Sequence, residues 1–273
     1  MKAKDLFPAI FSRHAEAYDR RLDQVMSRGE ARGRQRVIDL VAGRPGMRIL
    51  DLACGPGNLT RRLARSVAPG GEVVGVDLAP GMIEVARSRA IPHARFELMD
   101  IEELAFPDAS FDAATCGHGL QFVPHLDRAL GEARRVLRPG TKFAASVPVG
   151  APSQGVQDML DLVMARHLPA APRAVDQGAT RETVSDPKTF AAAAAGAGFA
   201  EARIETIDET VRWESVEQLV ALFTSWWDCA ARLERLTEEQ QAAFIDDALE
   251  TLRREHEGPL VTTARSLVLD ATA

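Results

Sequence analysis

The sequence predicts an α/β fold built on a largely parallel sheet, and three observations indicate it. Short apolar runs alternate with helical patterns between residues 47 and 147, which is typical of successive strand–helix–strand units. The first run ends in the turn "CGPG" before a helix, and the second ends in an acid, Asp77. Together these features predict a ligand site at the carboxyl edge of the sheet.

Five strands and three helices are predicted in this region. The strands are short apolar runs, at residues 47–53, 72–77, 94–100, 111–117 and 141–149. The helices carry apolar residues at helical spacing, at residues 58–67, 80–90 and 126–137. Asn58 suits the N-cap of the first helix and Pro80 the first turn of the second. Pro139 and Gly140 are expected to end the third.

The alternation loosens beyond Pro148. A helix over 154–168 lies between prolines and looks inserted after the fifth strand. Further helices are expected over 186–199, 215–236 and 238–256, and further strands over 201–213 and 258–273. Near the N-terminus, a helix is expected over 11–22.

The composition is that of an ordinary soluble globular protein, with 46% hydrophobic and 26% charged residues. A length of 273 residues suits one large α/β domain, or a core with a smaller appendage. The net charge of -6 disfavours a nucleic-acid partner, because phosphate binding relies on clustered Lys and Arg. The one basic cluster, residues 27–36, is interrupted by Glu30 and is expected to be a solvated helix face without a functional role.

The cysteines and apolar runs favour the cytoplasm. Three cysteines far apart predict no disulfide framework. No apolar run is long enough to span a membrane, and the N-terminus lacks a secretory pattern. No His or Cys spacing indicates a metal site.

The glycine turn and Asp77 together indicate an adenosine ligand. Gly55 and Gly57 allow a ligand to approach the backbone closely, but Thr60 stands where a dinucleotide fingerprint has its third glycine. Asp77 follows Gly57 by 20 residues, where an acid accepts hydrogen bonds from ribose hydroxyls. The glycine pair taken alone is equally compatible with a plain tight turn.

In these motifs the sequence resembles the class I S-adenosylmethionine-dependent methyltransferases. The motifs are "LDLACGPGNLT", "VVGVDLAPGMIEVA", "MDIEELAFPDASFDAATCGHGLQFV" and "ARRVLRPG", and they cover residues 45–147 in order. The resemblance is greatest to the small-molecule branch, which includes quinone-biosynthesis and natural-product enzymes. It implies a Rossmann-like, seven-stranded, mostly parallel sheet with helices on both faces and the last strand antiparallel. It also implies S-adenosyl-L-methionine as cofactor and S-adenosyl-L-homocysteine as product.

The resemblance also assigns cofactor roles. Asp51 would steer the methionine ammonium, Asp77 would hold the ribose, and Met82 would lie against the adenine. The full cofactor set is Tyr18, Asp51, Ala53, Gly55, Gly57, Asp77, Leu78, Met82, Asp100, Ile101 and Gly117. Several of these have structural alternatives: Met82 also suits a core position, Asp100 a turn cap, and Tyr18 a packing role.

His118 is the candidate catalytic base. It follows the fourth strand at the sheet edge, between two glycines that would leave room for a substrate, and histidine titrates in the useful range. Lining the pocket or contacting the cofactor are the alternative roles. Gln121, Trp226 and Trp227 are the candidate substrate residues, although tryptophans between helices are often core.

These observations favour methyl transfer to an oxygen or carbon of a small, apolar or phenolic metabolite. Two alternatives stay open: a non-methylating reaction such as cyclisation or decarboxylation at the same cofactor site, and a non-catalytic cofactor-binding regulator. The expected organisation is N-terminal helices over the cofactor in residues 1–45 and a methyltransferase domain in 46–273. Helical cover inserts are expected at about 148–185 and 214–257. The oligomeric state, monomer or homodimer, stays open.

Overall fold

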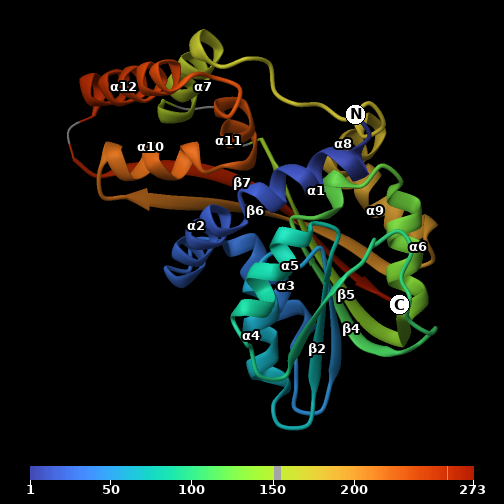
Figure 1. Ribbon diagram of the computed structural model, residues 1–273. Coiled ribbons are helices and arrows are strands. Elements are labelled where there is room, and N and C mark those ends of the chain that lie inside the picture. The colour runs from blue at the N-terminus through green and yellow to red at the C-terminus, as the bar shows by residue number, and fades with distance from the viewer. Residues whose placement is uncertain (151–154, 257) are drawn as a thin grey trace.

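The computed structural model describes residues 1–150, 155–256 and 258–273, and these form a single seven-stranded sheet flanked by helices (Figure 1). The strand order is β3-β2-β1-β4-β5-β7-β6. Strands β1 to β5 pair in parallel, and β7 is antiparallel to both β5 and β6. The predicted α/β fold, including the antiparallel last strand, is therefore confirmed.

The strands are β1 Arg48–Leu52, β2 Glu72–Asp77, β3 Ala94–Leu98, β4 Phe111–Gly117, β5 Leu137–Val149, β6 Ala200–Trp213 and β7 Leu260–Thr272. The first six helices are α1 Ala3–Arg13, α2 Ala15–Ser27, α3 Arg32–Val41, α4 Asn58–Val67, α5 Pro80–Ser88 and α6 Leu126–Val136. The later helices are α7 Val156–His167, α8 Gly178–Ser185, α9 Pro187–Gly196, α10 Val216–Thr224, α11 Trp227–Leu233 and α12 Glu238–Glu255, and a short 3-10 helix spans Leu120–Phe122.

Helices cover both faces of the sheet because its central strands are apolar on both sides. In β1, Leu50 and Leu52 face a core shared with α6 and α9, whereas Ile49 faces a core shared with α3 and α4. All three side chains are fully buried. This double coverage fixes the strands rigidly, so that the loops at their carboxyl ends are held in place.

The chain reverses its winding direction between β1 and β4. From β1 it proceeds outward through β2 and β3, and then returns to place β4 on the other side of β1. In an open α/β sheet, ligands bind at such a switch point, outside the carboxyl ends of the strands. The loops after β1, β2 and β4 meet there.

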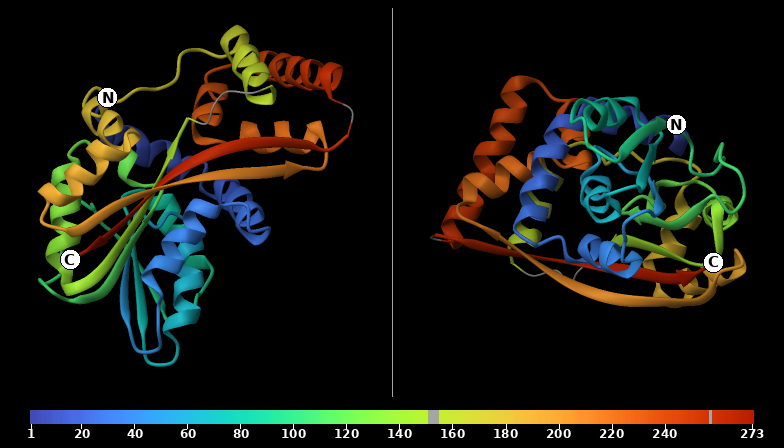
Figure 2. Two further views of the ribbon diagram at one scale, coloured as in Figure 1. Left: turned by 180° about the vertical axis from the view of Figure 1, so that it is seen from behind. Right: turned by 90° about the horizontal axis from the view of Figure 1, so that it is seen from below.

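The helices α7, α10, α11 and α12 gather at one end of the long strands β6 and β7, away from the rest of the sheet (Figures 1 and 2). They have an apolar core of their own, which includes Leu160, Trp213, Leu219, Phe244 and Leu252. A capping box starts α12, in which Thr237 accepts from the Gln240 amide and Gln240 accepts from the Thr237 amide. We call these four helices the cover; its role over a substrate stays a prediction.

The structure differs from the predicted elements in three places. The helix expected over 215–236 is two helices, because Trp226 adopts an extended backbone and acts as the N-cap of α11. The N-terminal helix is likewise split, at His14, into α1 and α2. Finally, α6 ends at Val136 and β5 begins at once, so that Pro139 and Gly140 lie within the strand, at an irregularity in its pairing with β4.

Candidate functional site

A cavity at the carboxyl edge of β1, β2 and β4 collects ten of the eleven predicted cofactor residues. We call it the cofactor cavity. It encloses about 940 Å³ of space, part of it open to solvent. Its lining includes Tyr18, Asp51, Ala53, Gly55, Asp77, Leu78, Met82, Asp100, Ile101 and Gly117.

The glycine turn after β1 is tied to the end of β2 by Asp77. One oxygen of this carboxylate accepts from the Gly55 amide at 2.8 Å and the other from the Ala79 amide at 2.9 Å. Gly55 and Gly57 both have positive φ, at 55° and 84°. Gly57 does not line the cavity: a side chain there would meet the Phe96 ring at 2.9 Å, so this glycine lets the turn pack against β3.

Asp51 is buried at the bottom of the cofactor cavity, 1% exposed. It accepts hydrogen bonds from the hydroxyls of Thr60 at 2.6 Å and Thr115 at 2.9 Å. Burial raises the pKa of Asp51 to about 6, and the two hydroxyl bonds oppose this rise. A cationic ligand group above this carboxylate would favour its charged form.

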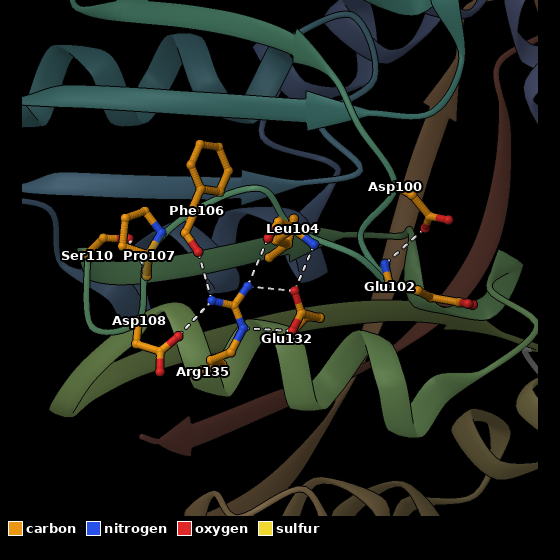
Figure 3. Close-up of polar contacts among 9 residues, drawn as sticks. All are labelled: Asp100, Glu102, Leu104, Phe106, Pro107, Asp108, Ser110, Glu132 and Arg135. Atoms are coloured by element: carbon orange, nitrogen blue, oxygen red, sulfur yellow. Dashed lines mark hydrogen bonds and ion pairs between the residues drawn. The ribbon is translucent and has the colours of Figure 1, made fainter.

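Asp100 and Ile101 are carried by the loop after β3, and Arg135 of α6 holds that loop in shape (Figure 3). Its guanidinium donates to the carbonyls of Phe106 at 2.7 Å and Leu104 at 2.9 Å. Asp100 itself accepts from the Glu102 amide at 2.9 Å, so it also caps a turn, as the sequence alternative suggested. The loop therefore presents its acidic end to the cavity from a fixed backbone.

Helix α1 closes the cofactor cavity on the side of this loop. Lys4 pairs with Asp100 at 2.6 Å and with Glu102 at 2.7 Å. Phe7 and Phe11, on the same helix, line the cavity and pack against Phe122. The N-terminal segment thus contributes directly to the walls of this site.

A second cavity lies between the cover and the long strands β6 and β7. We call it the acceptor cavity. It encloses about 1360 Å³ of space, part of it open to solvent, and its apolar wall includes Val25, Met164, Val211, Trp213, Phe223 and Trp226. Four residues line both cavities: Tyr18, Leu22, Arg34 and His118. The two cavities therefore meet at these four side chains.

His118 is positioned at this junction by a chain of hydrogen bonds. Its Nε2 lies 3.2 Å from the hydroxyl of Ser266 in β7, and that hydroxyl donates to Glu209 in β6. Because Ser266 gives its proton to Glu209, Nε2 is the protonated nitrogen that donates to Ser266. Burial lowers the pKa of His118 well below its ordinary value, and nearby Arg34 lowers it further.

The glycines beside His118 do not leave room for a substrate, contrary to the sequence expectation. A side chain at Gly117 would meet Leu59 at 2.7 Å, and one at Gly119 would overlap with Ala53. His118 itself has a φ of 63°. The glycines therefore allow this loop to pack closely against the turn after β1.

Arg34 is a candidate functional residue that the sequence interpretation missed. The basic cluster was expected to be solvated, but Arg34 is only 7% exposed and lines both cavities. It donates to the Tyr18 hydroxyl at 3.2 Å, and its Nε is buried without a partner among the described residues. The spacing of Arg34 from buried Val37 and Val41 on α3 was the available signal.

The predicted substrate residues do not lie together. Trp226 lines the acceptor cavity, whereas Trp227 packs against Phe7, Phe11 and Phe122. Gln121 lines neither cavity, and its amide nitrogen donates to the His118 carbonyl at 2.8 Å. Within residues 1–150, 155–256 and 258–273, no group of three or more His, Cys, Asp or Glu is arranged to hold a metal ion.

Comparison with known proteins finds a described family over part of this chain. Residues 49–140 match the family described as methyltransferase domain. The chain is 42% identical over 142 residues to 2-phytyl-1,4-naphtoquinone methyltransferase of Trichormus variabilis, covering 50% of this chain and 62% of that protein. It is 40% identical over 140 residues to demethylmenaquinone methyltransferase of Symbiobacterium thermophilum, covering 49% and 55%. The chain thus spans less than two thirds of either relative.

Solved structures agree at the level of the fold. The YcgJ protein of Bacillus subtilis superposes with a TM-score of 0.55 at 20% identity, over 88% of this chain and 98% of that one. A phosphoethanolamine N-methyltransferase of Haemonchus contortus superposes with a TM-score of 0.54 at 17% identity, over 88% and 52%. The segment that matches the methyltransferase-domain family, residues 49–140, begins within β1 and includes the glycine turn, Asp77 and the loop after β3. Residues 49–140 of this chain thus match a methyltransferase domain, and the fold is that of these solved structures.

Proposed function

We propose that this protein transfers a methyl group from S-adenosylmethionine to an oxygen or carbon of a small aromatic or phenolic acceptor. The observation that carries the proposal is the meeting of two cavities at Tyr18, Leu22, Arg34 and His118. Methyl transfer from a sulfonium is an in-line displacement, so donor and acceptor must face each other across a short gap closed to water. The junction of the two cavities provides such an arrangement.

The cofactor lies in the cofactor cavity in one orientation. Asp77, at the end of β2, accepts from the ribose hydroxyls, and Asp51 faces the methionine ammonium from below. Tyr18 and Arg34 hold the methionine carboxylate, which would pair the otherwise unpartnered Nε of Arg34. Met82 packs on the adenine, with Asp100 and the Ile101 backbone at its amino edge. This orientation directs the sulfonium toward His118.

His118 acts as the general base for a hydroxyl acceptor. Its Nε2–H is engaged by Ser266, which leaves the lone pair of Nδ1 to take the acceptor proton. The lowered pKa keeps the ring neutral at physiological pH, and it also makes the ring a weaker base than an exposed histidine. Bound S-adenosylmethionine would supply the methyl group to the acceptor oxygen and become a neutral thioether, and Nδ1 of His118 would take the proton that this oxygen loses.

The acceptor class is supported by the cavity and by the relatives. The acceptor cavity has aromatic walls at Trp213, Phe223 and Trp226. The names of the relatives given above are those of methyltransferases of a naphthoquinone, which is a benzene ring fused to a quinone ring, and of demethylmenaquinone. A ring of that size would fit between these walls with one edge at the junction.

Calorimetric titration tests the cofactor assignment. S-adenosylmethionine and S-adenosylhomocysteine should each bind in the micromolar range, and Asp77→Ala should weaken both. Failure of both ligands to bind the wild-type protein would overturn the proposal.

A search for products then tests the reaction itself. Incubation of the protein with a metabolite extract and S-adenosylmethionine should yield a product one CH₂ heavier than its precursor. A product that is changed but not methylated would favour a different reaction at the same site. His118→Ala with full activity at neutral pH would remove the general-base role.

A further inference from the structure

The acceptor cavity contains a cation that no group of the described chain neutralises. Arg21 lines this cavity, and its Nη1 is buried without a hydrogen-bond partner. Among residues 1–150, 155–256 and 258–273, no carboxylate lies within 4.0 Å of its guanidinium. Two arginines close to Arg21 in the sequence are each paired with an acid. Arg20 lies 3.6 Å from Glu16, and Arg28 lies 2.8 Å from Glu30.

Arg21 is held in a defined orientation by Trp226. The central carbon of its guanidinium lies 3.9 Å from the centroid of the Trp226 ring. An aromatic face attracts a guanidinium but leaves the N–H groups at its edge free for an acceptor in the same plane. This edge suits a carboxylate, which binds a guanidinium through two parallel hydrogen bonds.

The free-energy cost of burying the Arg21 charge is not offset by an ion pair with any of the residues that the structure describes. Burial lowers the pKa of Arg21 to about 10, so the group still carries its charge at physiological pH. The acids of the same cavity have other partners: Glu209 accepts from Ser266, and Asp161 accepts from Gln157. Asp228 pairs with Arg232 at 3.5 Å, and its second oxygen, although unpartnered, lies beyond 4.0 Å from Arg21. A buried, unpaired cation of this kind favours an anionic ligand.

We propose that the methyl acceptor is an aromatic acid whose carboxylate binds Arg21, while its ring packs against the apolar wall of the acceptor cavity. This inference rests on the proposed function, since it names the acceptor class for the same site. Arg34 is assigned to the cofactor carboxylate and Arg265 pairs with Asp208 at 2.6 Å, so Arg21 is the guanidinium of this cavity that remains for the acceptor. A single cation matches a singly charged carboxylate better than a doubly charged phosphate ester.

A matched pair of probes tests the proposal. 2-Naphthoate and 2-naphthamide have nearly the same shape, but only the first is charged. With S-adenosylhomocysteine present, calorimetry should show that the wild-type protein binds the acid at least about tenfold more tightly than the amide. Arg21→Gln should bind the two probes equally, and Arg21→Lys should keep part of the preference. Arg20→Gln, at an exposed neighbouring arginine, should behave as wild type.

The outcomes separate this inference from the proposed function. Affinity for S-adenosylhomocysteine should be unchanged in each variant, which shows that the fold and the cofactor cavity are intact. Equal binding of acid and amide by the wild-type protein, no binding of the acid, or an acid preference that survives Arg21→Gln would each overturn the inference. Tighter binding of 2-naphthyl phosphate than of 2-naphthoate would overturn the choice of a carboxylate. Loss of S-adenosylhomocysteine binding alone would contradict the proposed function instead.

Discussion

At the scale of single residues, the sheet edge gives two aspartates different surroundings. Asp77 is held by the amides of Gly55 and Ala79, so it orders the glycine turn before any ligand arrives. Asp51 is held by two threonine hydroxyls and lies deeper, and its pKa is raised to about 6. One carboxylate shapes the cofactor cavity, and the other sets the charge at its bottom.

The raised pKa of Asp51 predicts that cofactor binding depends on pH. Below about pH 6 this carboxyl gains a proton and loses the charge that attracts the methionine ammonium, so affinity falls by up to about tenfold per pH unit. Calorimetry with S-adenosylhomocysteine between pH 7.5 and 5 measures this change, on the order of one factor of ten. Asp51→Asn should bind more weakly at neutral pH and show little pH dependence. The same slope in that variant would assign the titration to another group.

Asp77→Asn should weaken S-adenosylhomocysteine binding by roughly 10- to 100-fold, because the amide loses the charge and one of the two backbone acceptors. The matched control is Asp186→Asn. Asp186 also accepts from two backbone amides, those of Lys188 and Thr189, but at the start of α9. Asparagine is a good N-cap, so this control should keep wild-type affinity. Equal effects of the two substitutions on affinity would contradict the role of Asp77.

His118 predicts a specific pH dependence of stability. Its pKa is lowered in the folded protein, so the unfolded chain binds the proton more readily. The stability contributed by the neutral ring is therefore complete above about pH 6.5 and is lost as the pH falls below that value, by up to about 1.4 kcal/mol per unit. Urea unfolding at pH 7.5 and 5.5, for wild type and His118→Gln, measures this loss. An equal loss in both proteins would show that other groups cause it.

At this scale the sequence predicted the residues that line the cofactor cavity better than those that line the acceptor cavity. Gly55, Asp77 and Asp100 follow directly from strand ends, where the parallel sheet brings loops together. Arg34 could not be assigned in the same way, because its burial depends on how α3 packs against β6 and β7. The separate surroundings of Trp226 and Trp227 depend on a helix break that periodicity does not reveal.

At the scale of elements, α3 depends on the absence of a side chain at Gly33. A Cβ at this position would lie 2.6 Å from the Ser266 Cβ and 2.9 Å from a Glu209 oxygen. The Gly33 amide also donates to Glu209 at 3.3 Å. The next residue on this helix is Arg34. The packing of Gly33 against Ser266 and Glu209 therefore also fixes the position of Arg34 at the junction of the two cavities.

Gly33→Ala should therefore destabilise the protein by about 1–3 kcal/mol through overpacking, and should also weaken S-adenosylhomocysteine binding by displacing Arg34. Gly131→Ala is the matched control, since Gly131 lies in α6 with open space around it. That control should stabilise the protein by about 0.4–1 kcal/mol. Urea unfolding and calorimetry measure both effects. A neutral effect of Gly33→Ala would contradict the close packing of α3.

At the scale of the whole molecule, the structure has cores on both faces of the sheet and a further apolar core in the cover. The sheet cores position the cofactor cavity, whereas the cover closes the acceptor cavity. Within the described residues, no helix is both long and apolar enough to cross a membrane. The sequence predicted the sheet because each strand and helix repeats a local pattern. The arrangement of the cover depends on contacts between distant segments, such as α7 with α12, which local patterns do not specify.

Phe244→Ala should weaken ligand binding in the acceptor cavity without weakening it in the cofactor cavity. Phe244 is fully buried in the core of the cover, and its truncation should cost that core about 3–5 kcal/mol. Hydrogen exchange should rise in α7, α10 and α12 but not in β1, β2 and β4. Affinity for S-adenosylhomocysteine should be kept while affinity for 2-naphthoate falls. Loss of both affinities together would show that the cover and the sheet unfold as one unit.

The central claim is that the two cavities bring a methyl donor and an aromatic acceptor together. Incubation with S-adenosylmethionine labelled in its methyl group, followed by mass spectrometry of an extract, tests this claim most directly. The account predicts a small aromatic product that carries the label, formed in step with S-adenosylhomocysteine and absent with Asp77→Ala. Labelled S-adenosylmethionine that binds but is never consumed, whatever aromatic acceptor is supplied, would contradict it.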